Sequence, residues 1–307
     1  MSRHQFKYAQ QHVFFRGLAW LFRQSWLLNI RRVIFRMLPY LRMQSQAKNT
    51  VYMSWLVDVD QLQARFPEPI QLWQRDGKTI FSILFYHHHH FGPHCFGPLR
   101  KLFPSPKQSN WRFYLAPSQL PQAVVFEQIV VDKMLYVFGG RLLSDAMPAQ
   151  YDPQLKHQVE DGQAGLDIQA KIHMDQRYDL KVHLTQAPEQ QLPEDWQGMF
   201  ESWDAALEFF VPQQHVWVEG VDRPQHLAQA DIRIDTDLSQ IKAMQIEQIE
   251  CGLFAELGIT ADSPALCFHI PELDFHVLNE HCRLPNQEAA DRSAQQQQIA
   301  KTSNTEQ

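Results

Sequence analysis

Cysteine is scarce in this chain, and its few cysteines are not arranged for disulfides or metal binding. The 307 residues contain only Cys95, Cys251, Cys267 and Cys282, and no two of them form a C-x-x-C pair. A disulfide scaffold, a zinc ribbon and a thioredoxin-like redox site are therefore excluded. Such cysteine usage is typical of a reducing compartment, so we expect a cytoplasmic protein.

Acidic residues are absent from the first 57 positions, which hold nine basic ones. The rest of the chain carries 19 basic and 34 acidic groups, and the whole has a formal net charge of −6. An acidic body argues against a nucleic-acid partner. The basic N-terminal segment needs an explanation of its own.

Long hydrophobic runs are also missing. Between His12 and Met43 arginines interrupt an apolar and aromatic sequence, and the longest charge-free stretch, Gln24–Ile30, has seven residues. A membrane-spanning helix needs about 20 mostly apolar residues, so a span is excluded. A secretory signal is a poor fit, because Arg16 and Arg23 interrupt its apolar core. We expect residues 1–48 to form one or two helices, broken near Pro39.

Three interpretations of this basic segment stay open. The favoured one packs its helices across the acidic body, with arginines paired to carboxylates. A second places residues 1–43 on an anionic membrane, at the inner membrane face, with Trp20 and Trp26 at the interface. A third is an organelle-targeting sequence. Residues 44–50 are polar and predict a linker.

Strand signals dominate the body, residues 49–285. We predict a hairpin over 71–86 around the turn Asp76-Gly77, and a second hairpin over 166–184. Tyr136–Phe138 is predicted to be a strand, and Ser202–Phe210 has the apolar spacing of a helix. Many short strands with few helices indicate an α+β, β-rich domain, built as a curved antiparallel sheet or a closed barrel.

Residues 286–307 contain no aromatic residue and are dominated by Gln, Ala, Ser and Thr. This composition predicts a disordered tail. The organisation is therefore a basic helical segment (1–48), a β-rich domain (49–285) and a Gln-rich tail (286–307).

The histidine run His87–His90 is the first candidate site. Imidazoles are good zinc or nickel ligands, but on a strand only alternate residues share a face. His87 and His89 could therefore bind one ion together, whereas the favoured interpretation is a strand end with partly exposed histidines. We expect neither a functional metal nor a cofactor. The Phe-Gly-Pro repeats that follow predict an ordered loop, which closes one end of a barrel or lines a pocket.

Two ionisable residues are candidates for catalysis. Lys133 lies in an otherwise apolar segment beside Asp132, and a buried lysine with a depressed pKa could form a Schiff base. An exposed turn lysine is the favoured interpretation. Glu127, paired with a histidine, would be an alternative acid–base group. The segment Gly139-Gly140-Arg141 lacks the Lys-Ser/Thr pair of a phosphate loop, and Arg141 is placed to bind a carboxylate, structural or from a ligand.

Several strings resemble one known family: WLVDVDQLQARFPEPIQL, DGKTIFSILFY and QSNWRFYL, followed by GRLLSDAMPAQY and SWDAALEFFVPQQHVWVEG. They resemble the YqjF-like domain of unknown function in the acetoacetate decarboxylase-like superfamily, over about residues 50–280. Asn110, Arg112 and Tyr114 match its N-x-R-x-Y strand. The resemblance implies a curved sheet around a cavity of small-molecule size.

The same resemblance also bears on chemistry. The decarboxylase works through a lysine Schiff base, and its lysines follow the proline of the Gly-Arg…Pro segment. Here Ala149 and Gln150 follow Pro148, so that route is not expected, whereas Arg141 is retained.

We therefore expect a protein that binds a small anionic or carbonyl ligand. Arg141 and Arg112 would meet the anionic group, and Tyr114, Trp111 and Phe91 would form apolar wall. An enzyme using Lys133 or Glu127, and a membrane-associated scaffold anchored by residues 1–43, are the alternatives. The sequence leaves homo-oligomerisation open.

Overall fold

A computed structural model describes residues 4–7, 13–22, 24–67, 70–118, 120–163, 165–222, 227–260 and 262–283. The predicted tail lies outside these residues. None of the described helices is both long and apolar enough to cross a membrane.

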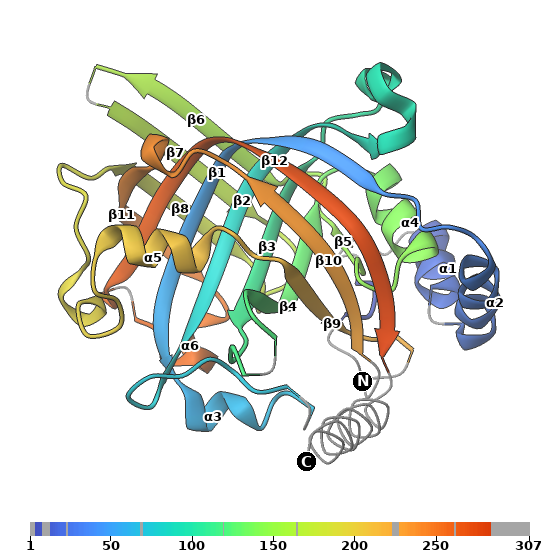
Figure 1. Ribbon diagram of the computed structural model, residues 1–307, viewed down its shortest axis with the longest axis horizontal. Coiled ribbons are helices and arrows are strands. Elements are labelled where there is room, and N and C mark those ends of the chain that lie inside the picture. The colour runs from blue at the N-terminus through green and yellow to red at the C-terminus, as the bar shows by residue number, and fades with distance from the viewer. Residues whose placement is uncertain are drawn as a thin grey trace, which may run out of the picture.

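The core of the fold is a closed seven-strand barrel (Figure 1). Each strand pairs with the next, and pairing of the first with the last closes the ring. All neighbours are antiparallel except β4 and β9, which are parallel. In order around the barrel the strands are β1 (Met43–Asp58), β2 (Lys78–Pro93), β3 (Lys107–Tyr114), β4 (Ala123–Val131), β9 (His215–Glu219), β10 (Leu227–Asp235) and β12 (Ala265–Arg283).

A second layer covers the outside of β1, β2 and β3. The first half of β12 also pairs with β11, and the sheet continues from there through β8 and β7 to β6. Apolar side chains of the two layers form one core, which includes Trp55, Phe81 and Trp111 of the barrel and Ile168 and Val182 of the cover. The covering strands are β6 (Lys156–Gly162), β7 (Gly165–Ile172), β8 (Leu180–Gln186) and β11 (Lys242–Cys251).

The barrel strands are therefore buried on both faces, which explains their sequence pattern. Every residue of β4 is buried, and its sequence AVVFEQIVV shows no regular alternation of polar and apolar residues. Strands covered on both faces typically read as continuous apolar runs. The inward-facing residues form a second core inside the barrel, which includes Tyr52, Leu84 and Phe268.

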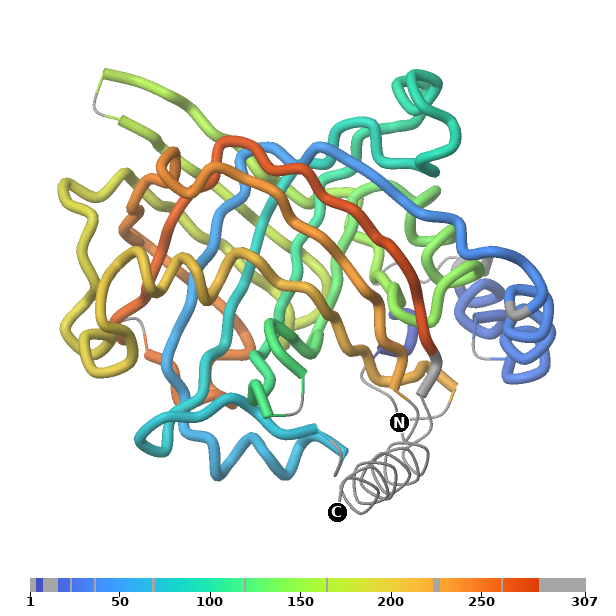
Figure 2. Tube along the Cα trace, viewed as in Figure 1, coloured from blue at the N-terminus to red at the C-terminus, as the bar shows by residue number. Residues whose placement is uncertain are grey.

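Four helices gather where β1 and β3 begin and β2 and β4 end (Figures 1 and 2). We call this region the helical end. The main chain connects its parts, because the His94 amide donates to the Arg42 carbonyl over 2.8 Å. The helices are α1 (Val13–Leu21), α2 (Ser25–Met37), the 3-10 helix η1 (His94–Leu102) and α4 (Met134–Leu143).

The aromatic side chains Trp196 and Phe210, which we call the aromatic plug, pack against the inner core away from the helical end. Helix α5 (Trp203–Phe210) begins at Ser202, whose side chain accepts from the Ala205 amide. Its Phe210 ring contacts Tyr114, Trp196 and Phe268. The remaining short elements are α3 (Val59–Gln63), β5 (Gln150–Tyr151), η2 (Glu194–Trp196), η3 (Leu238–Gln240) and α6 (Phe254–Leu257).

The main predictions of architecture are confirmed, with three corrections. The barrel, the 165–186 hairpin and the 203–210 helix are present. The linker predicted over 44–50 is wrong, because β1 begins at Met43, so the boundary predicted at residue 48 falls inside a strand. Tyr136–Phe138 belongs to α4 and not to a strand. The hairpin predicted over 71–86 forms only at the turn Asp76-Gly77, where Arg75 bridges to Lys78, because Leu72 pairs with Leu115 and not with β2.

Candidate functional site

A cavity of about 490 Å3 occupies the barrel interior toward the helical end. All seven barrel strands contribute to its lining, as do α2, the segment after it, α4 and the turn after α4. Its volume lies within the range of about 300–1,000 Å3 that is usual for small-molecule sites. The barrel therefore encloses a space suited to a ligand.

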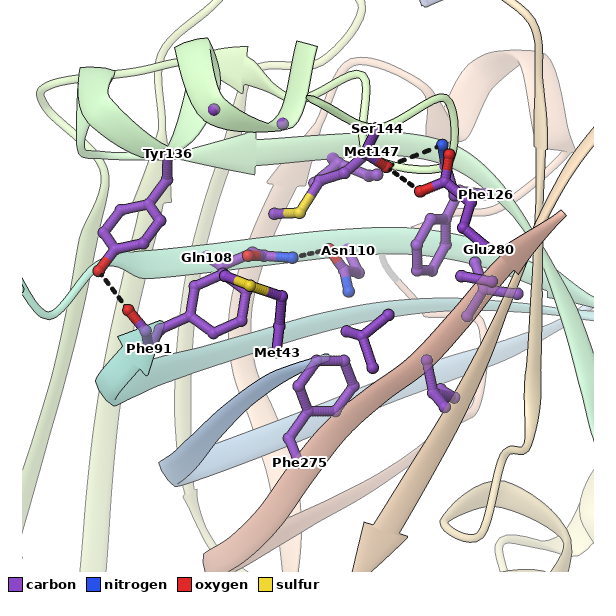
Figure 3. A pocket seen from close by; sticks show the side chains of 18 of the residues that line it. Met43, Phe91, Gln108, Asn110, Phe126, Tyr136, Ser144, Met147, Phe275 and Glu280 are labelled. Carbon is purple, nitrogen blue, oxygen red and sulfur yellow. Dashed lines mark hydrogen bonds between the residues drawn. The ribbon is translucent and has the colours of Figure 1, made fainter. Parts of the chain in front are cut away.

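Polar side chains of β2 and β3 form a row inside this cavity, and Figure 3 shows Gln108 and Asn110 of this row. Gln108, Asn110 and Arg112 alternate along β3 and so face inward together. The Gln108 amide donates to Asn110 Oδ1 over 2.8 Å, and Asn110 Nδ2 donates to the Tyr86 hydroxyl over 2.6 Å. Burial raises the pKa of Tyr86, so its phenol stays neutral. These bonds hold the row in a fixed arrangement.

Arg112 lies deepest along β3 from the helical end. Its Nη2 donates to the Tyr114 hydroxyl over 2.9 Å and to the Phe210 carbonyl over 3.2 Å. The guanidinium carbon lies 5.2 Å from the ring centroids of both Tyr52 and Tyr114. Among the described residues no carboxylate is paired with it, and its Nε has no hydrogen-bond partner. An arginine stays charged in proteins, so Arg112 is a buried cation for which the described part of the chain offers no counter-ion.

The remaining walls are mainly apolar. Phe91, Phe126 and Phe275 face the cavity (Figure 3). Tyr136 of α4 fixes one side, because its hydroxyl donates to the Phe91 carbonyl over 2.8 Å. Burial raises the pKa of Tyr136 to about 12, which keeps it a donor. An apolar lining with a few convergent polar groups is typical of ligand sites.

Charged groups surround the cavity where α2 meets the turn after α4. The Ser144 hydroxyl donates to Glu280 over 2.5 Å, and the Asp145 amide donates to its other oxygen over 2.6 Å (Figure 3). Burial raises the pKa of Glu280 despite these donors. Asp145 is in turn paired with both Arg31 and Arg32. The acids of this region are thus engaged in structural contacts.

The five residues predicted to bind a ligand separate into groups. Arg112 and Phe91 line the cavity. Tyr114 is buried between Arg112 and the aromatic plug, so it supports the site from behind. Trp111 faces the opposite side of β3, in the core between the two layers, where its ring packs on Tyr178. The alternation of a strand could have separated Trp111 from Asn110 and Arg112.

Arg141 is buried in α4 and serves the main chain. It donates to the carbonyls of Ala149, Pro148 and His4 over 2.6, 2.8 and 3.0 Å. It is not part of the cavity lining. The predicted reach of Arg141 toward a ligand is thus replaced by contacts that fix the turn after α4.

Neither catalytic candidate lines the cavity. Lys133 precedes α4 with its side chain 47% exposed, and it pairs with Asp132 over 3.2 Å. Glu127 sits at a bulge of β4, fully buried on the outer face, where it accepts from the Tyr178 hydroxyl over 3.0 Å and from Arg65 over 3.3 Å. No lysine is found among the described residues that line the cavity.

The histidine run alternates as expected for a strand. His87 and His89 share the outer face, with ring centroids 4.6 Å apart, whereas His88 points into the barrel and binds Ser45 over 2.7 Å. Within the described part of the chain no three His, Cys, Asp or Glu side chains are grouped to hold a metal ion. Tyr86, His88 and Gln108 line the cavity but were not predicted as site residues. Gln108 lies two residues before Asn110, and Tyr86 and His88 lie two and four residues after Leu84, the partner of Asn110 on β2. Strand alternation could therefore have identified them.

The buried histidines predict acid sensitivity. Burial lowers the pKa of His88 and of His157 to about 3 and that of His269 to about 4. Between pH 6.5 and 4 the unfolded chain binds protons that the native state does not, so stability falls as the pH falls. Each such histidine contributes about 1.4 kcal/mol per pH unit in this window.

We therefore expect His88→Gln to lose less stability than the wild type between pH 6.5 and 5, by about 1–2 kcal/mol. Urea unfolding at the two pH values measures the difference. His173→Gln, at a side chain that is 59% exposed, is the control and should follow the wild type. Parallel curves for His88→Gln and the wild type would contradict the assignment.

A family model now places the chain among known sequences. The model named DUF2071, described as an uncharacterized conserved protein, matches residues 44–271. The chain belongs to the DUF2071 family. The matched range begins in β1 and includes the polar residues of β2 and β3, whereas α2, the segment after it and the part of β12 beyond residue 271, which complete the cavity lining, lie outside it. No curated protein matches the chain.

Solved structures show the same fold. The enduracididine biosynthesis enzyme MppR with HEPES buffer bound superposes with a TM-score of 0.51 at 12% identity, covering 80% of this chain and 89% of that chain. Acetoacetate decarboxylase from Legionella pneumophila gives 0.50 at 14% identity, covering 80% and 88%. An acetoacetate decarboxylase-like enzyme from Sphingomonas wittichii RW1 gives 0.50 at 11%, covering 80% and 94%. This DUF2071 protein therefore has the acetoacetate decarboxylase-like fold.

Proposed function

We propose that the barrel binds a small organic anion with an apolar body, and that its anionic group contacts Arg112. The observation that carries the proposal is the buried guanidinium of Arg112, which has no carboxylate partner among the described residues. A buried charge is costly unless it is paired, so a ligand anion would complete the site. Carboxylates match the planar donor fork of arginine.

The surroundings of Arg112 support this ligand class. The described acids that line the cavity, Asp145 and Glu280, are held by contacts of their own around α2 and α4. The rings of Phe91, Phe126 and Phe275 suit a hydrocarbon body. The fold neighbour MppR has been solved in complex with pyruvate, itself a small carboxylate.

Amine catalysis is not part of the proposal. Ala149 and Gln150 are buried at the positions where the superfamily resemblance implies lysines. Lys133 is exposed and Glu127 is buried on the outer face of β4 beside Tyr178, so an acid–base role for either would need a site other than this cavity.

The test compares two probes of the same chain length. Octanoate is expected to bind about tenfold or more tightly than 1-octanol at pH 7, because a hydrogen bond to a charged group contributes about 1.5–3 kcal/mol. Isothermal titration calorimetry measures both affinities. Octylamine is the control of opposite charge and should bind weakest. Equal affinities for acid and alcohol would refute Arg112 as the anchor.

A further inference from the structure

The exposed apolar side chains of this protein are concentrated at the helical end. Among the described residues, every large apolar side chain that is exposed lies in α1, α2, the segment from Leu38 to Leu41, η1 or α4. Leu102 of η1 is 82% exposed and Met37 of α2 is 81% exposed. Concentrated apolar surface of this kind marks an interaction site.

These elements form one continuous region. Arg31 of α2 donates to the Ser144 carbonyl just after α4 over 2.9 Å. The Tyr136 hydroxyl of α4 lies 2.5 Å from the Pro104 carbonyl oxygen just after η1 and shares its one proton between this oxygen and the Phe91 carbonyl. Figures 1 and 2 show the helices together at this end, with η1 in teal and α1 and α2 in blue. We call their outer face the helical-end surface.

The charge of the helical-end surface has one sign. The sequences of α1, α2, η1 and α4 contain no acidic residue. Exposed Arg16, Arg42 and Lys101 add positive charge. The neighbouring Asp145 and Asp222 are turned inward, with side chains 12% and 0% exposed, and pair with Arg32. Apolar, tryptophan-containing and basic, the surface is complementary to anionic lipid.

The cavity opens through the same surface. Phe35 and Leu143 both line the cavity and are 41% and 58% exposed, and Leu38 and Leu41 likewise belong to both sets. Side chains that touch both the cavity and the solvent mark its mouth. The mouth is thus bordered by apolar side chains of α2 and α4 on the basic surface.

We propose that the helical-end surface docks on an anionic lipid bilayer, with the mouth of the cavity against the membrane. The docking proposal rests on the helical-end surface alone and not on the proposed ligand. Its consequence for the ligand rests on the proposed function: an apolar anion would pass between the bilayer and Arg112 without crossing water. Interfacial binding of this type grows with the apolar area inserted and with attraction to anionic headgroups.

The test uses the full-length chain and vesicles of phosphatidylcholine, alone or mixed with phosphatidylglycerol. Co-sedimentation should show binding to the mixed vesicles and much weaker binding to phosphatidylcholine alone, decreasing with salt. Leu99→Glu/Leu102→Glu on η1 and Val33→Glu on α2 should each weaken binding about tenfold or more. None of these side chains lines the cavity.

Gln158→Glu/Gln248→Glu is the matched control, because it adds two negative charges at exposed positions of the covering sheet. It should bind vesicles like the wild type. Thermal unfolding followed by circular dichroism checks that all variants are folded. The proposal would be overturned if the wild-type protein did not bind the mixed vesicles, or if the η1 and α2 variants bound them like the control.

The experiments also distinguish vesicle docking from dimerisation, and the docking proposal from the anion-site proposal. A dimer in analytical ultracentrifugation that Val33→Glu dissociates, without vesicle binding, would overturn docking in favour of a second copy of the chain. Octanoate titration on the same samples keeps the two proposals apart. Octanoate binding without vesicle binding refutes the docking alone, and vesicle binding without a preference for octanoate refutes the anion site alone.

Discussion

Arg112→Met should weaken octanoate binding about hundredfold while lowering the free energy of unfolding by less than ~1 kcal/mol. The loss of affinity follows from the geometry, because the guanidinium is the charged group deepest in the cavity and no carboxylate competes for it among the described residues. Removing one partner of a buried charge-assisted contact commonly costs 2–5 kcal/mol of binding, and about 1.4 kcal/mol is tenfold.

The small effect on stability has a separate cause. In the free protein the buried charge of Arg112 is desolvated, and among the described residues it is compensated by the side chains of Tyr52 and Tyr114 and by the Phe210 carbonyl. Methionine keeps the length and the apolar contacts without that desolvation cost. The loss of two hydrogen bonds and the relief of a buried charge therefore oppose each other.

The matched control is Arg141→Met, at another buried guanidinium. Arg141 holds three carbonyls around α4 and does not line the cavity, so its loss should destabilise the fold and leave octanoate affinity within about twofold. Calorimetry and urea unfolding on both variants give the two quantities. The opposite pattern, with Arg141→Met losing affinity and Arg112→Met binding normally, would assign the anion site to Arg141.

Local signals predicted much of the fold. The turn Asp76-Gly77 has positive φ at both residues, as a tight hairpin turn requires, and Ser202 caps α5. The start of β1 was missed because its sequence MQSQAKNT is polar. Inside a barrel with a cavity, polar residues can face inward, as the buried Ser45 does when it binds His88. Only the pairing with β2 and β12 makes this segment a strand, and such pairing is not encoded locally.

Helix α4 shows a second limit of local reasoning. Tyr136–Phe138 is apolar and aromatic, which favours a strand. The segment is helical because Tyr136, Val137 and Arg141 then share the face that packs on the barrel. Gly140 permits close packing there, since a Cβ at this position would lie 2.6 Å from the Met147 carbonyl oxygen. The deciding contacts come from the turn after the helix.

The candidate site was predictable in part. The pattern Asn110, Arg112 and Tyr114 correctly describes one inward row, because strand alternation is exact over so short a distance. From the sequence, Arg141 was as good a candidate for the anion contact as Arg112, since nothing local distinguishes a ligand-facing guanidinium from one that binds carbonyls. The contribution of α2 to the mouth depends on pairs of opposite charge more than 100 residues apart, which sequence periodicity does not report.

Removing one of those pairs, in the variant Asp222→Ala, should lower the stability of the protein strongly. Arg32 makes two bidentate contacts, to Asp222 over 2.8 and 2.9 Å and to Asp145 over 2.9 Å twice. Asp222 has a fully buried side chain, and that of Arg32 is 12% exposed. Removing one member of a buried pair costs about 3–5 kcal/mol, because the other charge stays buried. We expect about 3 kcal/mol here, since Arg32 keeps Asp145.

The loss of stability in Asp222→Ala should be local to α2. Leu28 is its only described apolar side chain that is fully buried, so α2 is held mainly by Arg31 and Arg32. Limited trypsin digestion should cut Asp222→Ala after these arginines well before the barrel unfolds in urea. Asp235→Ala is the control, because Asp235 pairs with Arg233 over the same 2.8 Å but both side chains are more than half exposed. An exposed pair contributes about 0–1 kcal/mol. If the two variants proved equally stable and equally resistant to trypsin, apolar contacts and not the ion pairs would hold α2 over the mouth of the cavity.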